Sequence, residues 1–373
     1  MKELQIILTR EQFREHVFNR DGNRCVICED KNNLDPHHII DRKCFNNGGY
    51  LLSNGITLCN MCHQKAETGI YTCEELRSKA NITEIILPIG FDPLLSYDKW
   101  GEIIKEELIK YPRTSHLQGS GIDKDDLKET VSFEDIFGKN LIIESKIDGA
   151  NTGVSFSSDC ELLLQCRGHY LTGKGDWPEF NNFKVWANTW KDQIFDIISD
   201  RYIMYGEWMY AFHTVYYDLL PHFFMEFDIY DKKEKVFLST ENRKKILDKC
   251  EVKIESVKVL KHGTFNKKED IISLIGISSF ISENSIENLK KECDEKNLPQ
   301  NEKDILLELN KSRLMEGLYI KWEEDGIVKG RYKYVRPEFV RAILAYDKHW
   351  TKRPTIPNKM RDNCSMFQLK EII

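Results

Sequence analysis

A lysine at the end of an apolar run is the residue with the clearest capacity for covalent chemistry. The run NLIIES ends at Lys146, and Asp148 and Gly149 follow within three positions. A lysine amine attacks phosphorus only when it is neutral, and its reference pKa is about 10.4. Nearby cations and a metal ion lower that pKa. If the Lys146 amine is a nucleophile toward phosphorus, basic partners are expected close to it.

Further segments downstream carry the other groups that such chemistry needs. They are YGEW at 205–208, EFDIY at 226–230, EGLYI at 316–320 and KGRYK at 329–333. Glu207 and Glu316 offer carboxylates for divalent ions. Lys329, Arg331 and Lys333 offer cations for phosphate. Each segment alone is ordinary, but their joint occurrence in this order after a KxDG is hard to attribute to chance.

This order and spacing resemble the covalent nucleotidyltransferase superfamily, and the surrounding residues look most like its ATP-dependent RNA ligase branch. The resemblance implies that Lys146 is the catalytic nucleophile and that Phe227 stacks on adenine. It implies a phosphate or ribose contact for Arg167. For the α-phosphate contact Lys333 is favoured, with Arg331 second and Lys329 not excluded. The implied nucleotide-binding positions are Lys146, Asp148, Arg167, Glu207, Phe227, Asp228, Glu316, Arg331 and Lys333.

The resemblance covers residues 106–340 and implies a complete reaction. Lys146 becomes adenylylated by ATP, AMP passes to a 5′-phosphate, and a 3′-hydroxyl displaces the AMP. The cofactors implied are ATP with Mg²⁺ or Mn²⁺, which Glu207 and Glu316 help to bind. The partner implied is nucleic acid, as RNA ends or a nicked duplex.

Two CxxC units stand near the N-terminus, formed by Cys25 with Cys28 and Cys59 with Cys62. Paired thiolates at this spacing suit a closed, tetrahedral structural Zn²⁺ site. A small segment with few large apolar residues also needs a bound metal or a similar cross-link to stabilise its fold. The sequence therefore predicts a structural zinc in the first 85 residues.

Histidines around these units resemble the HNH endonuclease family. The resemblance implies that His37 and His63 bind a catalytic metal and that His38 is the general base for water. Asn54 would orient that base and hold the loop. Many members carry a further histidine where this chain has Glu67, and a carboxylate also ligates a hard cation, which favours Mg²⁺ or Mn²⁺. Two interpretations stay open: an active nuclease, or a zinc module that only binds nucleic acid or packs on the ligase.

Two other functions compete with an RNA ligase that carries an HNH module. One is an HNH nuclease of phage defence or mobile-element biology with the ligase half as an accessory. The other is a nucleic-acid sensor with a vestigial ligase half, which the intact Lys146, both glutamates and the terminal cations oppose.

Composition sets wide limits on class and compartment. The chain has 373 residues, 41% of them hydrophobic and 31% charged, which is an ordinary globular mix. No apolar run approaches the roughly 20 residues of a membrane span. Eleven cysteines, four of them in CxxC units, favour metal binding in a reducing compartment over a disulfide framework. We therefore expect a cytoplasmic protein, and its net charge of −6 requires local basic patches for any nucleic-acid contact.

The pattern along the chain predicts an α+β protein. An HNH-like ββα zinc module occupies residues 1–85, a linker with a helix-like pattern follows at 86–105, and a short tail occupies 341–373. The ligase domain at 106–340 is expected to hold mainly antiparallel strands, with helical segments such as TENRKKILDKC and NEKDILLELNKSRL between 241 and 312.

The tail is too short for the OB-fold of DNA ligases. His213 and His222 are expected to pack, and Arg113 in the 110–120 stretch is either a phosphate contact or part of a surface loop.

Overall fold

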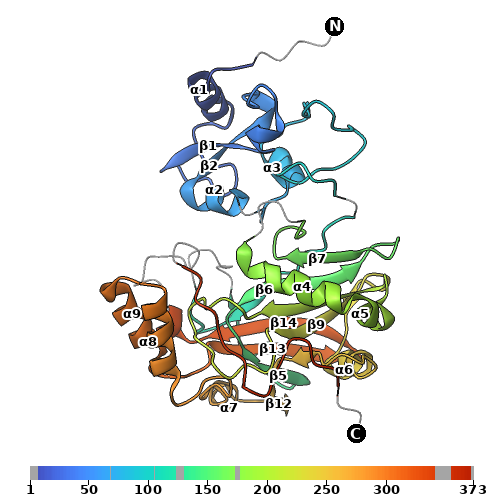
Figure 1. Cartoon of the computed structure of the whole chain (residues 1–373), viewed down its shortest axis with the longest axis vertical. Helices are drawn as coiled ribbons and strands as arrows, with labels where there is room; N and C mark the ends of the chain where they lie inside the picture. The colour runs from blue at the N-terminus through green and yellow to red at the C-terminus, as the bar shows by residue number, and fades with distance from the viewer. Residues whose placement is uncertain are drawn as a thin grey trace. The chain divides into compact units, whose positions relative to one another are not determined.

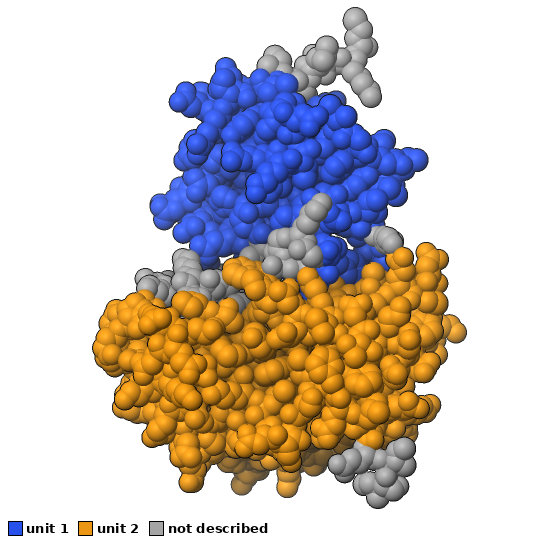
Figure 2. All heavy atoms as spheres, viewed as in Figure 1, with its two compact units in different colours: residues 1–110, 165–176 blue, residues 111–164, 177–373 orange. Residues whose placement is uncertain are grey.

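The chain folds as two compact units (Figure 2). The computed structural model describes residues 7–67, 69–104, 106–122, 130–172, 177–340 and 354–370. Unit 1 comprises residues 1–110 and 165–176, and unit 2 comprises residues 111–164 and 177–373.

Unit 1 is built on a two-stranded antiparallel sheet of β1 (Leu34–His38) and β2 (Gly55–Cys59). Helix α2 (Asn60–Glu67) follows β2 directly, which gives the order strand, strand, helix (Figure 1). Its remaining elements are α1 (Arg10–Arg20), α3 (Cys73–Lys79) and the 3₁₀ turns η1 (Arg42–Cys44) and η2 (Leu52–Asn54). Capping boxes at Thr9 and Thr72 begin α1 and α3, because each threonine hydroxyl accepts an otherwise unpaired helical N–H.

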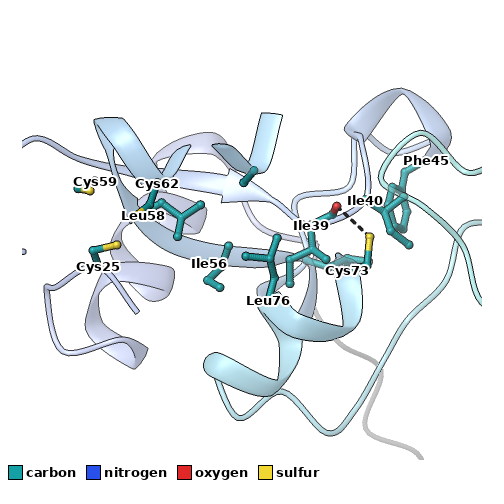
Figure 3. Packing of buried hydrophobic residues seen from close by; sticks show 12 residues of the cluster. Cys25, Ile39, Ile40, Phe45, Ile56, Leu58, Cys59, Cys62, Cys73 and Leu76 are labelled. Carbon is teal, nitrogen blue, oxygen red and sulfur yellow. Dashed lines mark hydrogen bonds between the residues drawn. The ribbon is translucent and has the colours of Figure 1, made fainter. Parts of the chain in front are cut away.

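The core of unit 1 is small and includes three of the CxxC cysteines. Ile39, Ile56, Leu58 and Leu76 pack together, and Cys25, Cys59 and Cys62 belong to the same buried cluster (Figure 3). Each buried aliphatic side chain contributes about 1.5–3 kcal/mol. So small a core needs a further constraint, and the cysteines lie where a bound metal would supply it.

Unit 2 holds two six-stranded sheets. The first has the order β10-β9-β8-β6-β7 with β11 paired to β9, and the second has the order β12-β5-β13-β14-β3-β4. Their strands are β3 (Ser115–Leu117), β4 (Thr130–Val131), β5 (Leu141–Lys146), β6 (Ala150–Phe156), β7 (Leu162–Cys166), β8 (Tyr202–Trp208), β9 (Phe224–Asp231), β10 (Val236–Phe237), β11 (Glu255–Ser256), β12 (Val259–Gly263), β13 (Gly317–Glu324) and β14 (Ile327–Val335). The helical elements are η3 (Pro178–Phe180), α4 (Asn181–Thr189), α5 (Lys191–Ile198), α6 (Thr240–Leu247), α7 (Lys268–Ile272), α8 (Ser285–Glu295) and α9 (Gln300–Asn310).

The α+β prediction is confirmed, and the expected strands and helices of unit 2 are present. Helices α4 and α5 were not predicted. The pairs β11–β9, β14–β3 and β3–β4 are parallel, whereas most of the pairing is antiparallel, as expected. Parallel pairing depends on which segments meet in space, so a local pattern does not reveal it.

The helix expected within 86–105 is wrong. No helix lies between α3 and β3 in the described residues 80–104 and 106–114. Asp98 Oδ1 accepts hydrogen bonds from the backbone N–H groups of Trp100 (2.9 Å) and Glu102 (2.8 Å). Tyr97 and Ile103 form a short antiparallel bridge across this turn. An aspartate side chain that accepts a hydrogen bond from the backbone N–H two residues later competes with helix formation. The segment therefore forms a turn at Asp98 and not a helix.

Residues 354–370, which belong to the predicted tail, pack along unit 2. They form bridges between Pro357 and Ala211 and between Met360 and Leu220. Asn358 is 2% exposed within this segment. Among the described residues, no helix has the length and apolar character needed to cross a membrane.

Candidate functional site

Lys146 is the last residue of β5, where the buried run ends and the side chain reaches a partly exposed position. In the neighbouring strand β13, Gly317 stands opposite Lys146. A Cβ on Gly317 would lie 2.1 Å from the carbonyl oxygen of Tyr334, so only glycine allows this close approach. The preceding residue, Glu316, therefore meets Lys146, and Lys146 Nζ lies 2.7 Å from Glu316 Oε2.

Asp148 is held by a loop between β8 and β9. Its Oδ2 accepts hydrogen bonds from the backbone N–H groups of Thr214 (2.7 Å) and Val215 (2.9 Å). Its own backbone N–H donates to the Tyr217 hydroxyl at 3.1 Å. Asn358 Oδ1 in turn accepts from the backbone N–H of Tyr217 at 2.9 Å. Asp148 thus fixes the turn after Lys146 with its carboxylate.

Gly149 contacts Glu207, another acidic residue predicted for the site. Its backbone N–H donates to Glu207 Oε1 at 3.1 Å, and a Cβ at this position would lie 2.6 Å from the carbonyl oxygen of Trp208. The KxDG glycine is needed because β8 runs directly beside it. Lys146, Asp148, Glu207 and Glu316, all predicted site residues, therefore form one cluster.

The charges of this cluster favour a protonated lysine. Burial lowers the pKa of Lys146, but the carboxylates of Glu316 and Glu207 outweigh it and the net pKa shift is upward. Burial raises the pKa of Glu207 to about 7 and also raises the pKa of Glu316. The expectation that nearby cations of the chain lower the lysine pKa is wrong, because its strongest charged neighbours are acidic.

The three predicted cations lie in different surroundings. Lys333 pairs with Tyr319 across β13 and β14, and its charge acts on Glu316 by lowering that carboxyl's pKa. The Arg331 guanidinium lies over the Phe237 ring, 3.8 Å from its centroid. Lys329 forms an exposed ion pair with Asp325 at 3.5 Å. This arrangement favours Lys333 as the cation nearest the Lys146–Glu316 pair.

Aromatic rings surround the predicted base-stacking residue. Phe227 is partly exposed on β9, and its ring meets the edge of Tyr111 with centroids 5.1 Å apart. The Tyr111 hydroxyl donates to Asp228 Oδ2 at 2.5 Å and lies 2.6 Å from the Tyr319 hydroxyl. Tyr111 belongs to the 110–120 stretch, where sequence reasoning considered only Arg113. A tyrosine on an irregular segment gives no periodic signal, so it was missed.

Asp228 is fully buried and supports this aromatic cluster through ion pairs. Lys321 Nζ, also fully buried, lies 3.0 Å from Asp228 Oδ1 and 2.9 Å from Glu144 Oε2. Arg243 on α6 lies 2.8 Å from both Glu144 and Glu226. Because β5 and β9 belong to different sheets, this network joins the two sheets beside the site. Breaking one partner of such a buried pair costs about 3–5 kcal/mol. The predicted nucleotide contact of Asp228 itself stays a prediction.

Three further residues were considered from the sequence: Arg167, His222 and His213. Arg167 is exposed and lies in the 165–176 segment of unit 1. His222 packs as expected: it is buried against Trp186, and its Nδ1 accepts from the backbone N–H of Phe224. The side chain of His213 is 8% exposed, its Nε2 lies 3.7 Å from Glu179, and its charge acts to lower the pKa of Glu207.

Comparison with known proteins supplies the deciding observation. A family model described as RNA ligase matches residues 139–335, more than half of the chain and the whole Lys146 cluster. The chain belongs to the RNA ligase family.

Solved structures similar to this RNA ligase family member include Naegleria gruberi RNA ligase with PPi. It is 18% identical, with a TM-score of 0.38, and the match covers 79% of this chain and 74% of that one. A mutant of the same ligase with AMP and Mn is 17% identical, with a TM-score of 0.38 and coverage of 65% and 67%. No curated protein shows significant similarity to the chain.

Residues 1–110, which form most of unit 1, precede the matched residues 139–335. The four CxxC cysteines of this part of the chain come together. Cys25 and Cys28 precede β1, Cys59 ends β2, and Cys62 lies in the first turn of α2. Their sulfur atoms all lie within 4.8 Å of one another. A hydrogen bond from Cys62 lowers the pKa of Cys25 to about 4, whereas burial raises the pKa of Cys28 to about 11. Four converging sulfurs without a disulfide fit the predicted Zn²⁺.

A second cluster brings together His37, His63 and Glu67, whose ligand atoms also lie within 4.8 Å of one another. Glu67 Oε1 is 3.2 Å from His37 Nδ1 and 3.4 Å from His63 Nε2. His37 is 1% exposed, and burial lowers its pKa to about 4, which keeps the imidazole in the neutral form that binds metals. His37 Nε2 has no hydrogen-bond partner among the described residues, and Nδ1 faces the Glu67 carboxylate. This arrangement of buried imidazole and carboxylate fits a divalent cation.

His38, the predicted base, is the next residue of β1, so its side chain leaves the strand on the opposite face from His37. Its ring stacks on Phe13 with centroids 4.6 Å apart, and burial lowers its pKa to about 4. Asn54 is buried and locks the following turn: its Oδ1 accepts from the backbone N–H of Ile40, and its Nδ2 donates to the Ile40 carbonyl. Asn54 thus holds the loop as predicted, and the catalytic role of His38 stays a prediction.

Proposed function

We propose that this protein is an ATP-dependent RNA ligase that works through a lysyl-AMP intermediate. The observation that carries the proposal is the Lys146–Glu316 contact at the centre of the RNA ligase match. The Lys146 nitrogen attacks the α-phosphorus of ATP, a phosphoramidate bond forms, and pyrophosphate leaves. AMP then passes to the 5′-phosphate of a strand, and a 3′-hydroxyl displaces AMP to form the phosphodiester.

The residues around Lys146 have distinct parts in this proposal. Glu316 orients the amine for in-line attack and is within 2.7 Å to take its proton. Lys333 meets the negative charge of the α-phosphate, and Phe227 stacks on adenine. Arg331 and Asp228 support the aromatic cluster around that ring.

The divalent ion that the family implies fits this acidic cluster. Glu207 and Glu316 would hold Mg²⁺ or Mn²⁺, since both are carboxylates with raised pKa values beside the reactive amine. When bound, the cation offsets the carboxylate charges that raise the lysine pKa and so favours the neutral amine.

A covalent adduct tests the ligase proposal. Protein incubated with α-labelled ATP and Mg²⁺ should carry an acid-labile AMP label on a denaturing gel, and α-labelled GTP should label it far less. Lys146→Ala should abolish the label, whereas Lys261→Ala, at an exposed position of β12, should retain it. Labelling of Lys146→Ala at the wild-type level would exclude Lys146 as the nucleophile.

A second function, metal-dependent action on nucleic acid by unit 1, is favoured by the His37–His63–Glu67 cluster. We propose that this unit is an HNH-like module with a structural Zn²⁺ at the four cysteines and Mg²⁺ or Mn²⁺ at the second cluster. In the nuclease form of this proposal, His38 takes a proton from water as it attacks a phosphodiester. In the other form, the module only binds nucleic acid.

Single substitutions separate the two forms. His38→Ala should remove metal-dependent cleavage of DNA or RNA and leave formation of the AMP adduct intact. His16→Ala, at an exposed position of α1, is the matched control. Full cleavage by His38→Ala would show that another residue is the general base. If the wild type does not cleave nucleic acid, the proposal that unit 1 only binds nucleic acid is favoured.

A further inference from the structure

Glu67 divides its two carboxylate oxygens between different partners. Oε1 faces the two imidazoles, 3.2 Å from His37 and 3.4 Å from His63. Oε2 lies 2.6 Å from Lys99 Nζ. The side chain of Glu67 is 55% exposed, so the end of α2 alone does not hold it in this orientation.

Lys99 lies outside β1, β2 and α2, in a segment whose backbone is held by hydrogen bonds. It comes from the segment that the sequence indicated as a linker, yet it is only 7% exposed. Its backbone carbonyl accepts a hydrogen bond from the N–H of Asp41 at 2.8 Å, next to η1. The turn at Asp98 fixes the backbone on the other side of Lys99. Because hydrogen bonds hold the backbone on both sides of this buried lysine, its ammonium group has a defined position.

We propose that Lys99 is a metal-selectivity residue of the His37–His63–Glu67 site, because it leaves Glu67 only one oxygen for the ion. This inference rests on the proposed metal site of unit 1. Ca²⁺ takes six to eight oxygen ligands and commonly binds a carboxylate through both oxygens, whereas Mg²⁺ requires octahedral geometry and uses one oxygen of each carboxylate. Mn²⁺, like Mg²⁺, binds carboxylate ligands in octahedral geometry. Lys99 therefore selects Mg²⁺ or Mn²⁺ against Ca²⁺.

The ratio of the Ca²⁺ and Mn²⁺ affinities separates the effect of Lys99 on metal coordination from the effect of its charge. The ammonium repels every divalent cation near Glu67, so removing it strengthens binding of Mn²⁺ and Ca²⁺ alike through Coulomb's law. Only the freed second oxygen of Glu67 distinguishes the two ions. The ratio of the Ca²⁺ and Mn²⁺ dissociation constants thus reports on coordination.

Calorimetric titration of the zinc-loaded full chain with Mn²⁺ and then with Ca²⁺ tests the proposal. His37→Ala defines the ions bound elsewhere, including those at Glu207 and Glu316. The wild type and Lys79→Met, an exposed control on α3, should prefer Mn²⁺. Lys99→Met should lose about tenfold or more of that preference, because Ca²⁺ gains an oxygen. Lys99→Arg should restore it, since a guanidinium also occupies Oε2.

Each result decides one question. An unchanged Ca²⁺-to-Mn²⁺ ratio in folded Lys99→Met would overturn the role of Lys99 while the metal site stands. Equal Mn²⁺ binding by the wild type and His37→Ala would remove both the site and this inference. Zinc content reports whether Lys99→Met is folded, and if it is not, Lys99→Ala provides the same comparison.

Discussion

Lys146 and Glu316 are separated by 170 residues in the chain, yet their side chains meet at 2.7 Å between Nζ and Oε2. The contact arises because β5 and β13 are neighbours, with Gly317 directly opposite Lys146. A carboxylate in this position holds the amine and raises its pKa. These neighbours favour the protonated form of Lys146, so the proposed nucleophilic role requires an added cation to offset the carboxylate charges.

Binding of the divalent ion should depend on pH through Glu207. Burial raises the pKa of this carboxyl to about 7, so the group gains a proton as the pH falls through 7 and loses its ability to bind a cation. Below that pH, Mn²⁺ affinity at the Lys146 site should fall by about tenfold per pH unit, one proton competing with one ion. Titrations of His37→Ala with Mn²⁺ between pH 5.5 and 8.5 measure this site apart from unit 1. The same variant carrying Glu207→Gln should bind more weakly with a flatter profile, and an identical pH slope would show that another group titrates.

Asn358→Ala should weaken both folding and adenylylation. Asn358 accepts from the Tyr217 N–H at 2.9 Å and donates to the Met209 carbonyl at 2.8 Å in a buried position. Each group left unpaired costs about 1–3 kcal/mol, so the free energy of unfolding should fall by about 2–4 kcal/mol. The loop that holds Asp148 loosens as well, so AMP labelling should slow even at temperatures where the variant is folded. Asn363→Ala, exposed in the same segment, should change neither quantity. Unchanged stability and labelling in Asn358→Ala would contradict a structural role for this segment.

Loss of one CxxC cysteine should affect unit 1 alone. Elemental analysis of the wild type should find about one Zn per chain, as in closed thiolate sites. Cys59→Ser should lose that zinc and become protease-sensitive before residue 80, while AMP labelling of Lys146 continues. Cys160→Ser, an exposed cysteine of unit 2, should keep the metal. Zinc retained at the wild-type level in Cys59→Ser would refute the four-cysteine site.

Sealing should require ribose on the 3′-hydroxyl side of the break. The chain belongs to the RNA ligase family, and a single 2′-hydroxyl, which both donates and accepts a hydrogen bond, is enough to distinguish RNA from DNA. Nicked duplexes that differ only in the sugar of the last two nucleotides of the 3′-hydroxyl strand provide the comparison. The RNA-ended nick should seal faster, with either DNA or RNA as the 5′-phosphate strand, and sealing should slow as salt rises. Equal sealing of the all-DNA nick would exclude this preference.

The sequence by itself determined the chemical groups of the ligase site and the strands that carry them. Lys146, Asp148, Glu207 and Glu316 were identified from short motifs, because each motif couples a functional residue to a local apolar run. The two CxxC units and the histidines were found in the same way, and the structure brings each set together. Local patterns are informative here because alternation along a strand and ligand spacing are properties of a few consecutive residues.

Only the tertiary structure decided what surrounds these groups. The upward shift of the Lys146 pKa, the hydroxyl of Tyr111 on Asp228, the pairing of Lys321 with Glu144, and Lys99 on Glu67 all join residues far apart in the chain. Such contacts depend on which strands and turns become neighbours, and a charge is raised or lowered by whichever groups meet in space. A buried lysine in an irregular turn has no periodic pattern to reveal it, so its place beside a carboxylate follows from the fold alone.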